Sequence, residues 1–274
     1  MNKKIAAALT GGTLAATAVF ATSAAAQTAP AHKAVGAAAP SSQQAKPTIV
    51  LVSGAFEDSS SWDGEISALQ SAGYQVIAPA VPLRGVASDS AYLTSVVHAI
   101  SGPVVLVGHS YGGPLITEIA ANDPGQVKAL VYAAAFIPQA GESVSQLDSQ
   151  FPGSLLGQDT TYTVSYAGGT ETYVKPADFQ ELFASDRTAS QAAVAAATQR
   201  PVESDALSEP VAAGVPAGIP VYAIVASNDK AIPPAAELFE AKRAGAVITT
   251  VNSAHDLPTS HPAAVTAVIE RAAR

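Results

Sequence analysis

The sequence contains no cysteine among its 274 residues. This absence excludes disulfide bonds, a cysteine nucleophile, thiolate metal ligands and a lipid anchor attached through cysteine. Basic residues are also scarce, with 14 Lys and Arg against 22 Asp and Glu, and they form no cluster. The formal net charge is −8, and this acidity argues against nucleic acid or an anionic membrane as a partner.

The first 26 residues follow a three-part pattern that is typical of a bacterial secretory signal. Two early lysines are followed by a mostly apolar stretch up to Phe20, and three alanines precede Gln27. Threonines and glycines interrupt the apolar stretch, which is already short for spanning a bilayer. We therefore expect residues 1–26 to be a signal peptide that is removed on export, and the mature protein to be periplasmic or secreted.

Residues 27–46 are rich in Ala, Pro, Ser and Gln and have no apolar periodicity. This composition predicts a flexible tether. Residues 47–274 have a length that is usual for one domain and contain no internal repeat. A chain of this length can be stabilised by its core alone, so the lack of disulfides is no obstacle to folding.

Short apolar runs alternate with helical patterns through this domain. The runs are rich in Val and Ile and nearly continuous, which is typical of strands buried on both faces. Segments such as 62–72 and 234–244 have the length and period of crossover helices. The alternation predicts an α/β fold with a mostly parallel sheet of about six strands covered by helices. The predicted strands are residues 48–53, 74–79, 103–108, 127–136, 219–227 and 246–251.

A segment from about residue 139 to residue 216 breaks this rhythm. An insertion between two core strands would lie above their carboxyl ends, where ligands bind in parallel sheets. We predict a small cap insertion there; the alternative is a peripheral segment without contact to the site. Phe56, Trp62 and, in the insertion, Phe151 and Phe183 are candidates for the substrate wall, although each is also plausible as core.

The stretch Gly108-His109-Ser110-Tyr111-Gly112 separates a predicted strand from a predicted helix. This is the G-x-S-x-G pattern of a nucleophile elbow, in which a strained turn exposes the serine hydroxyl. The N–H of Tyr111 is expected to point to where an oxyanion would form, at the positive end of the helix. An ordinary turn serine is the alternative, and the position between strand and helix disfavours it.

A serine nucleophile needs a base, and His255 is the best candidate because it follows the last predicted strand. His109 is expected to be a packed residue of the elbow. His261 is expected to belong to a helix start with Ser260 as N-cap and Pro262 in the first turn. The other two histidines are His32 in the tether and His98 in a helical pattern.

The base in turn needs a carboxylate that fixes its tautomer. Asp229 lies just beyond the penultimate predicted strand, although an Asn-Asp pair there is also common turn chemistry. Glu142, after the strand at 127–136, is the stronger rival, and Asp256 is a poor one because it is adjacent to His255. Asp229 gives the chain order Ser, Asp, His of α/β-hydrolases.

Four stretches carry a family resemblance: SGAFEDSSSW after the first strand, LVGHSYGG, DKAIPP, and SAH followed by SHP. From about Thr48 onward the chain resembles α/β-hydrolase fold serine esterases, in the branch related to plant methyl-ester esterases and hydroxynitrile lyases. The resemblance implies a triad of Ser110, Asp229 and His255, with oxyanion donors from Tyr111 and Ala55. One departure is Ser53-Gly54, where relatives usually carry His-Gly.

The expected function is hydrolysis of a small-molecule carboxylic ester by a serine enzyme without metal or organic cofactor. Two alternatives stay open: a lyase that splits a cyanohydrin on the same scaffold, and a binding protein with weak turnover. The related lyases resemble one another in a lysine directly after the catalytic histidine, and this chain has Asp256 there.

Overall fold

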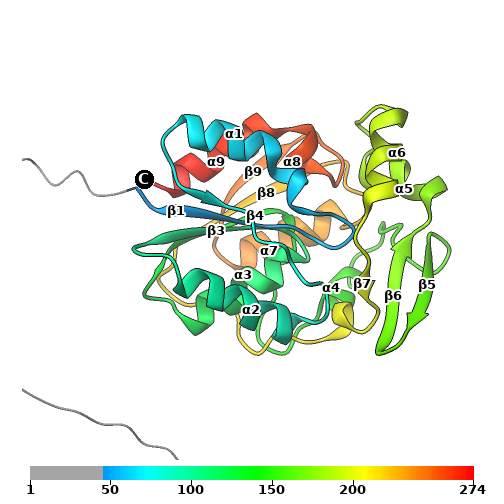
Figure 1. Ribbon diagram of the computed structural model, residues 1–274, viewed down its shortest axis with the longest axis horizontal. Coiled ribbons are helices and arrows are strands. Elements are labelled where there is room, and N and C mark those ends of the chain that lie inside the picture. Colours follow the sequence, from blue (N-terminus) through cyan, green and yellow to red (C-terminus); the bar gives the residue numbers. More distant parts are fainter. Residues whose placement is uncertain (1–45) are drawn as a thin grey trace, which may run out of the picture. The chain divides into compact units, whose positions relative to one another are not determined.

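The computed structural model describes residues 46–274, so the predicted signal peptide and nearly all of the predicted tether lie outside the described residues. Six parallel strands form a central sheet in the order β2-β1-β3-β4-β8-β9 (Figure 1). The α/β fold with a six-stranded sheet is confirmed. The strands are β1 (Thr48–Val52), β2 (Val76–Ile77), β3 (Val104–Ser110), β4 (Val127–Ala135), β8 (Val221–Ala226) and β9 (Val247–Val251).

Helices cover both faces of this sheet (Figure 1). The two faces of the sheet form two hydrophobic cores. In β1, Val50 and Val52 belong to the first core, and Ile49 and Leu51 belong to the second. Because both sets are apolar, β1 is one continuous hydrophobic run in the sequence. The first core is shared with α2 (Val86–His98), α3 (Gly112–Asn122) and α7 (Pro234–Arg243), and the second with α1 (Asp63–Ser71), α8 (Leu257–Ser260) and α9 (Pro262–Ala272).

The start of the last helix differs from the sequence prediction in one respect. Pro262 occupies the first turn of α9 as expected, but the N-cap residue is His261, without a side-chain cap bond. Ser260 is instead the last residue of the short helix α8, and its hydroxyl lies 2.8 Å from Nδ1 of His261. The prediction was wrong because residues Leu257–Ser260, with Pro258 in the first turn, form a separate short helix just before α9.

The insertion between β4 and β8 contains its own three-stranded antiparallel sheet, in the order β5-β6-β7. Figure 1 shows this sheet with two helices beyond one end of the central strands. Most of β5 is exposed, so the alternation of polar and apolar residues in its sequence does not correspond to a buried face. The elements are α4 (Val144–Ser149), β5 (Thr161–Tyr166), β6 (Gly169–Val174), α5 (Pro176–Phe183), α6 (Ala189–Thr198), β7 (Val202–Glu203) and the 3₁₀ turn η2 (Ala206–Ser208); a second 3₁₀ turn, η1 (Ser59–Trp62), precedes α1.

Backbone hydrogen bonds join the insertion to loops at the carboxyl ends of the central strands. The N–H of Phe56, after β1, donates to the carbonyl of Arg200 at 3.0 Å. The N–H of Asp256, after β9, donates to the carbonyl of Phe183 at 2.8 Å. The insertion therefore contacts the loop after β1, which contains Ala55, and the loop after β9, which contains His255. Within residues 46–274, no helix is long and apolar enough to cross a membrane.

Candidate active site

Ser110 lies at the corner between β3 and α3 in a strained backbone conformation. Its φ is +52°, in the left-handed region that residues with a side chain rarely adopt. A Cβ atom at Gly108 would lie 2.6 Å from the Gly112 carbonyl oxygen, and one at Gly54 would lie 2.7 Å from the Ser110 Cβ. Glycine at positions 54 and 108 therefore lets the end of β3, the start of α3 and the loop after β1 approach one another closely enough to form the turn.

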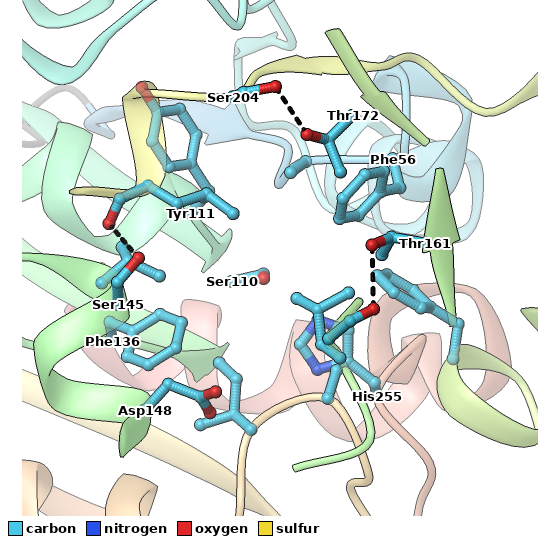
Figure 2. Close-up of a pocket in the computed structure, with 18 of the residues that line it drawn as sticks. Phe56, Ser110, Tyr111, Phe136, Ser145, Asp148, Thr161, Thr172, Ser204 and His255 are labelled. Atoms are coloured by element: carbon cyan, nitrogen blue, oxygen red, sulfur yellow. Dashed lines mark hydrogen bonds between the residues drawn. The ribbon is translucent and has the colours of Figure 1, made fainter. Parts of the chain in front are cut away.

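Asp229 and His255 are held together by a short hydrogen bond. The Asp229 Oδ2 atom lies 2.6 Å from Nδ1 of His255, and Oδ1 accepts the N–H groups of Ala231 at 2.7 Å and Ile232 at 2.8 Å. A carboxylate can only accept, so Nδ1 of His255 carries the proton and Nε2 presents its lone pair. This Nε2 atom is buried without a partner among residues 46–274, and His255 lines the same cavity as Ser110 (Figure 2).

A second buried carboxyl lies behind Asp229. Burial raises the pKa of Glu237 well above its ordinary value, and the charge of Asp229 acts in the same direction. Glu237 Oε2 accepts the N–H of Ala226 at 3.2 Å. A protonated Glu237 leaves the negative charge of this pair on Asp229, where it can stabilise a positively charged His255.

The two rival carboxylates are engaged elsewhere. Glu142 forms a two-pronged pair with Arg243, with both oxygens 2.7 Å from guanidinium nitrogens. Asp256 pairs with Arg187 of the insertion, and it lines a different cavity from Ser110. Asp229 is therefore the carboxylate that contacts the ring of His255.

Ala55 and Tyr111, the predicted oxyanion donors, both line the cavity around Ser110. Neither backbone N–H takes part in a hydrogen bond with another described residue. The Ser53 hydroxyl accepts the indole N–H of Trp62 at 3.1 Å and donates to the Asp58 carbonyl at 3.1 Å. Ser53, at the position where relatives usually have histidine, thus connects the chain before Ala55 to Asp58 and Trp62 after it.

The cavity has a volume of about 470 Å³, which suits a small organic molecule. Phe56 and Phe183 line it as predicted, and the Phe183 ring meets the His255 ring edge to face with centroids 4.8 Å apart. Trp62 and Phe151 do not line it, which corrects their assignment as wall candidates. Trp62 is fully buried in the core beside α1, and Phe151 packs against Phe239.

Several lining residues were missed by the sequence reasoning. Phe136 directly follows β4, so its place at the carboxyl edge could have been inferred from the strand pattern. The polar lining residues of the insertion gave no such signal. They are Asp148 on α4, Thr161 on β5, Thr172 on β6, and Ser204 directly after β7 (Figure 2). Among the described residues, no group of three His, Asp or Glu side chains could hold a metal ion.

His109 is buried behind the elbow, as predicted, and forms an ion pair. Its Nδ1 lies 2.9 Å from Glu57 Oε2, and its Nε2 lies 2.9 Å from the His255 carbonyl oxygen. Burial alone would lower the pKa of His109, but the Glu57 carboxylate outweighs burial and raises it to about 9. The charged imidazole can donate to the His255 carbonyl, so it supports the backbone of the predicted base.

Glu65 on α1 is a buried carboxyl without a partner among residues 46–274. Burial raises the pKa of Glu65 from 4.5 to about 8. The folded state therefore binds a proton that the unfolded state releases, and this contribution to stability is lost as pH rises from about 4.5 to about 8. His109 acts in the same direction at higher pH, because its stabilising charge is lost as pH rises through about 9.

We expect Glu65→Gln to become more stable relative to wild type as pH rises, by about 3 kcal/mol between pH 5.5 and pH 8. Urea unfolding at both pH values measures this difference. Glu181→Gln is the matched control, because the Glu181 side chain is 68% exposed. A difference between Glu65→Gln and wild type that does not change with pH would contradict a buried, proton-binding Glu65.

Comparisons with known proteins place the chain in a family. The model of the alpha/beta hydrolase family matches residues 49–268. The carbendazim hydrolyzing esterase of Nocardioides sp. (strain SG-4G) is 32% identical over 110 residues, which cover 36% of this chain and about half, 46%, of that protein. The alpha/beta hydrolase nvfD of Aspergillus novofumigatus (strain IBT 16806) is 27% identical over 83% of this chain and 97% of its own length.

The fold is similar to that of solved esterase structures. The crystal structure of polyneuridine aldehyde esterase superimposes with a TM-score of 0.72 at 18% sequence identity. The superposition covers 83% of this chain and 99% of that one. At this identity the likeness concerns the fold alone.

Proposed function

Since this chain belongs to the alpha/beta hydrolase family, we propose that it is a serine hydrolase that cleaves carboxylic esters of small molecules through an acyl-enzyme intermediate. One observation carries the proposal. A serine on a strained turn shares a cavity with a histidine whose Nδ1 is bonded to a buried carboxylate and whose Nε2 is free. The esterase names of the relatives point in the same direction.

In the proposed reaction, the Ser110 oxygen attacks the ester carbonyl carbon while Nε2 of His255 takes the hydroxyl proton. The N–H groups of Ala55 and Tyr111 stabilise the oxyanion. The alcohol leaves with the proton from His255, and the acyl group stays on Ser110. Water then attacks this acyl group, gives a proton to His255, and releases the acid as Ser110 regains its hydrogen.

Cyanohydrin cleavage has less support, because departing cyanide needs a nearby cation. Among the described residues that line the cavity there is no Lys or Arg. The carboxylate of Asp256 does not bear on this point, because it pairs with Arg187 and lines another cavity. Ester hydrolysis needs the triad, the oxyanion donors and water, and no cation for a leaving anion.

Labelling and turnover together test the proposal. A fluorophosphonate probe should label the folded protein on the peptide that contains Ser110, and p-nitrophenyl esters of increasing acyl length should be hydrolysed. Labelling reports an activated serine without knowledge of the substrate, while the ester series locates the preferred acyl length. Folded protein that takes up no label would refute a serine enzyme. Labelling with cyanide release from mandelonitrile and no ester hydrolysis would instead support a lyase.

The proposal includes export to the periplasm or the medium, supported by the signal pattern of residues 1–26. The exported protein is expected to begin at or near Gln27, after the run of three alanines. Mass spectrometry of the protein recovered from periplasm and medium measures its N-terminus. A chain that starts at Met1 in those fractions would contradict this expectation.

A further inference from the structure

One carboxylate in the cavity has no part in the proposed reaction. Asp148, on α4 of the insertion, lines the cavity together with Ser110 and His255. Figure 2 shows it on the cavity wall beside Phe136. Asp229 is anchored by two backbone N–H groups and His255, whereas Oδ1 of Asp148 is buried without a hydrogen-bond partner within residues 46–274. Asp148 is therefore available to a ligand.

Asp148 lines the cavity with a carboxylate that is only partly satisfied, because its Oδ1 atom is buried without a partner among residues 46–274. A buried polar atom without a partner is costly, and the cost falls when a donor approaches the same carboxylate. The nearby Ser154 hydroxyl donates instead to the Ala231 carbonyl at 2.8 Å.

The charge around the cavity favours a positive ligand. The described lining residues include no Lys or Arg, so nothing on the wall neutralises Asp148. Burial raises the pKa of Asp148 to about 6; the nearby Ser154 hydroxyl and His255 oppose this effect, and the charge of Asp229 adds to it. At pH 7.5 the carboxylate is ionised, so a cation or an N–H donor that enters the cavity meets an unpaired negative charge.

We propose that Asp148 is a specificity-determining residue that binds an ammonium or N–H donor group of the substrate, so that esters carrying such a group are preferred over neutral and anionic esters. This inference rests on the proposed ester hydrolysis and names the substrate class for the same site. The mostly apolar wall around Phe56, Phe136 and Phe183 holds the carbon skeleton. The carboxylate then selects by charge.

Three matched esters test the preference: 3-(aminomethyl)phenyl acetate as the cation, 3-ethylphenyl acetate as the neutral ester and 3-acetoxybenzoate as the anion. The measured quantity is the kcat/KM of the cation divided by that of the neutral ester, at pH 7.5. Dividing the wild-type ratio by the Asp148→Asn ratio cancels the intrinsic reactivity of the esters. We expect this quotient to be at least about ten. We also expect the kcat/KM of the anionic ester, divided by that of the neutral ester, to be higher in Asp148→Asn than in wild type.

Asp159→Asn is the matched control, because it removes one negative charge from an exposed position of the insertion outside the cavity lining. Its ratio should stay within about twofold of wild type, since an exposed charge is screened by salt. A quotient for Asp148→Asn that is also within twofold would overturn the proposal. Equal losses for all three esters would overturn it as well, because they would indicate a merely structural role.

The selectivity should also depend on pH in a defined direction. As pH falls from 7.5 to 5, Asp148 takes up a proton near pH 6 and the preference for the cation should fade. The charged or titratable groups that act on Asp148 or respond to it are Asp229, His255 and Glu240. Both esters depend equally on Asp229 and His255, so a change in turnover that is common to the two esters cancels in the ratio. A cation preference that is constant from pH 7.5 to 5 would contradict the proposal.

Binding of benzylammonium separates this inference from the proposed function. Calorimetric titration of Ser110→Ala protein, with and without Asp148→Asn, needs no turnover. We expect the dissociation constant to rise about tenfold when Asp148 is replaced. If ester hydrolysis fails but this difference is found, Asp148 is a cation site in a protein of another activity; if hydrolysis succeeds and the difference is absent, the specificity proposal alone is overturned.

Discussion

Ser110→Ala is expected to lower kcat for ester hydrolysis by about 10⁶-fold, because it removes the oxygen that forms the acyl-enzyme in the proposed reaction. Activity above the uncatalysed rate would then come from the oxyanion donors and from binding. Alanine keeps the Cβ that faces Gly54 and adopts the same φ as readily as serine, so the fold should be retained. Kinetics on a p-nitrophenyl ester, together with thermal unfolding, measure both effects.

Ser145→Ala is the control for this experiment. Ser145 lines the same cavity, but its hydroxyl already donates to the Leu207 carbonyl at 3.0 Å. The Ser145→Ala substitution should lower kcat by less than about tenfold and leave labelling by the fluorophosphonate intact. If Ser110→Ala kept substantial turnover while folded, the nucleophile would have to be sought elsewhere in the cavity.

The inner strands of the central sheet could be predicted from sequence because they are buried on both faces. β1 and β3 are buried along their whole length, whereas the edge strands β2 and β9 are partly exposed. The site residues could be predicted for a related reason. Ser110, Asp229 and His255 each end or follow a strand, and parallel strands bring their carboxyl ends to one edge.

The insertion was less predictable because local pattern does not determine it. The strand β5 alternates polar and apolar residues, but its apolar side chains are exposed, so the alternation does not indicate a core face. It pairs with β6 through a turn at Gly168, whose φ is +133°. Trp62 could not be assigned to cavity or core from sequence, since an apolar aromatic suits both. The role of Asp148 depends on a short helix folding over the cavity, and no spacing in the sequence indicates that contact.

The hydrogen bonds of the Asp229 carboxylate make Asp229→Asn a sharp test of whether Asp229 orients the base His255. Oδ1 of residue 229 accepts two backbone N–H groups, and an asparagine oxygen can continue to do so. The asparagine NH₂ would then face Nδ1 of His255 and donate to it. His255 would have to carry its proton on Nε2, where it cannot take the proton of Ser110.

We therefore expect Asp229→Asn to lower kcat by about 10⁴-fold while unfolding remains cooperative. Glu142→Gln is the matched control, because this carboxylate pairs with Arg243 and not with His255. Its activity should stay within a few fold of wild type, and the loss of the partly exposed ion pair should cost about 1 kcal/mol of stability or less. Steady-state kinetics and urea unfolding on both variants separate the two carboxylates. If Glu142→Gln lost the activity and Asp229→Asn kept it, the hydrogen bond between Asp229 and His255 would not be the one that orients the base.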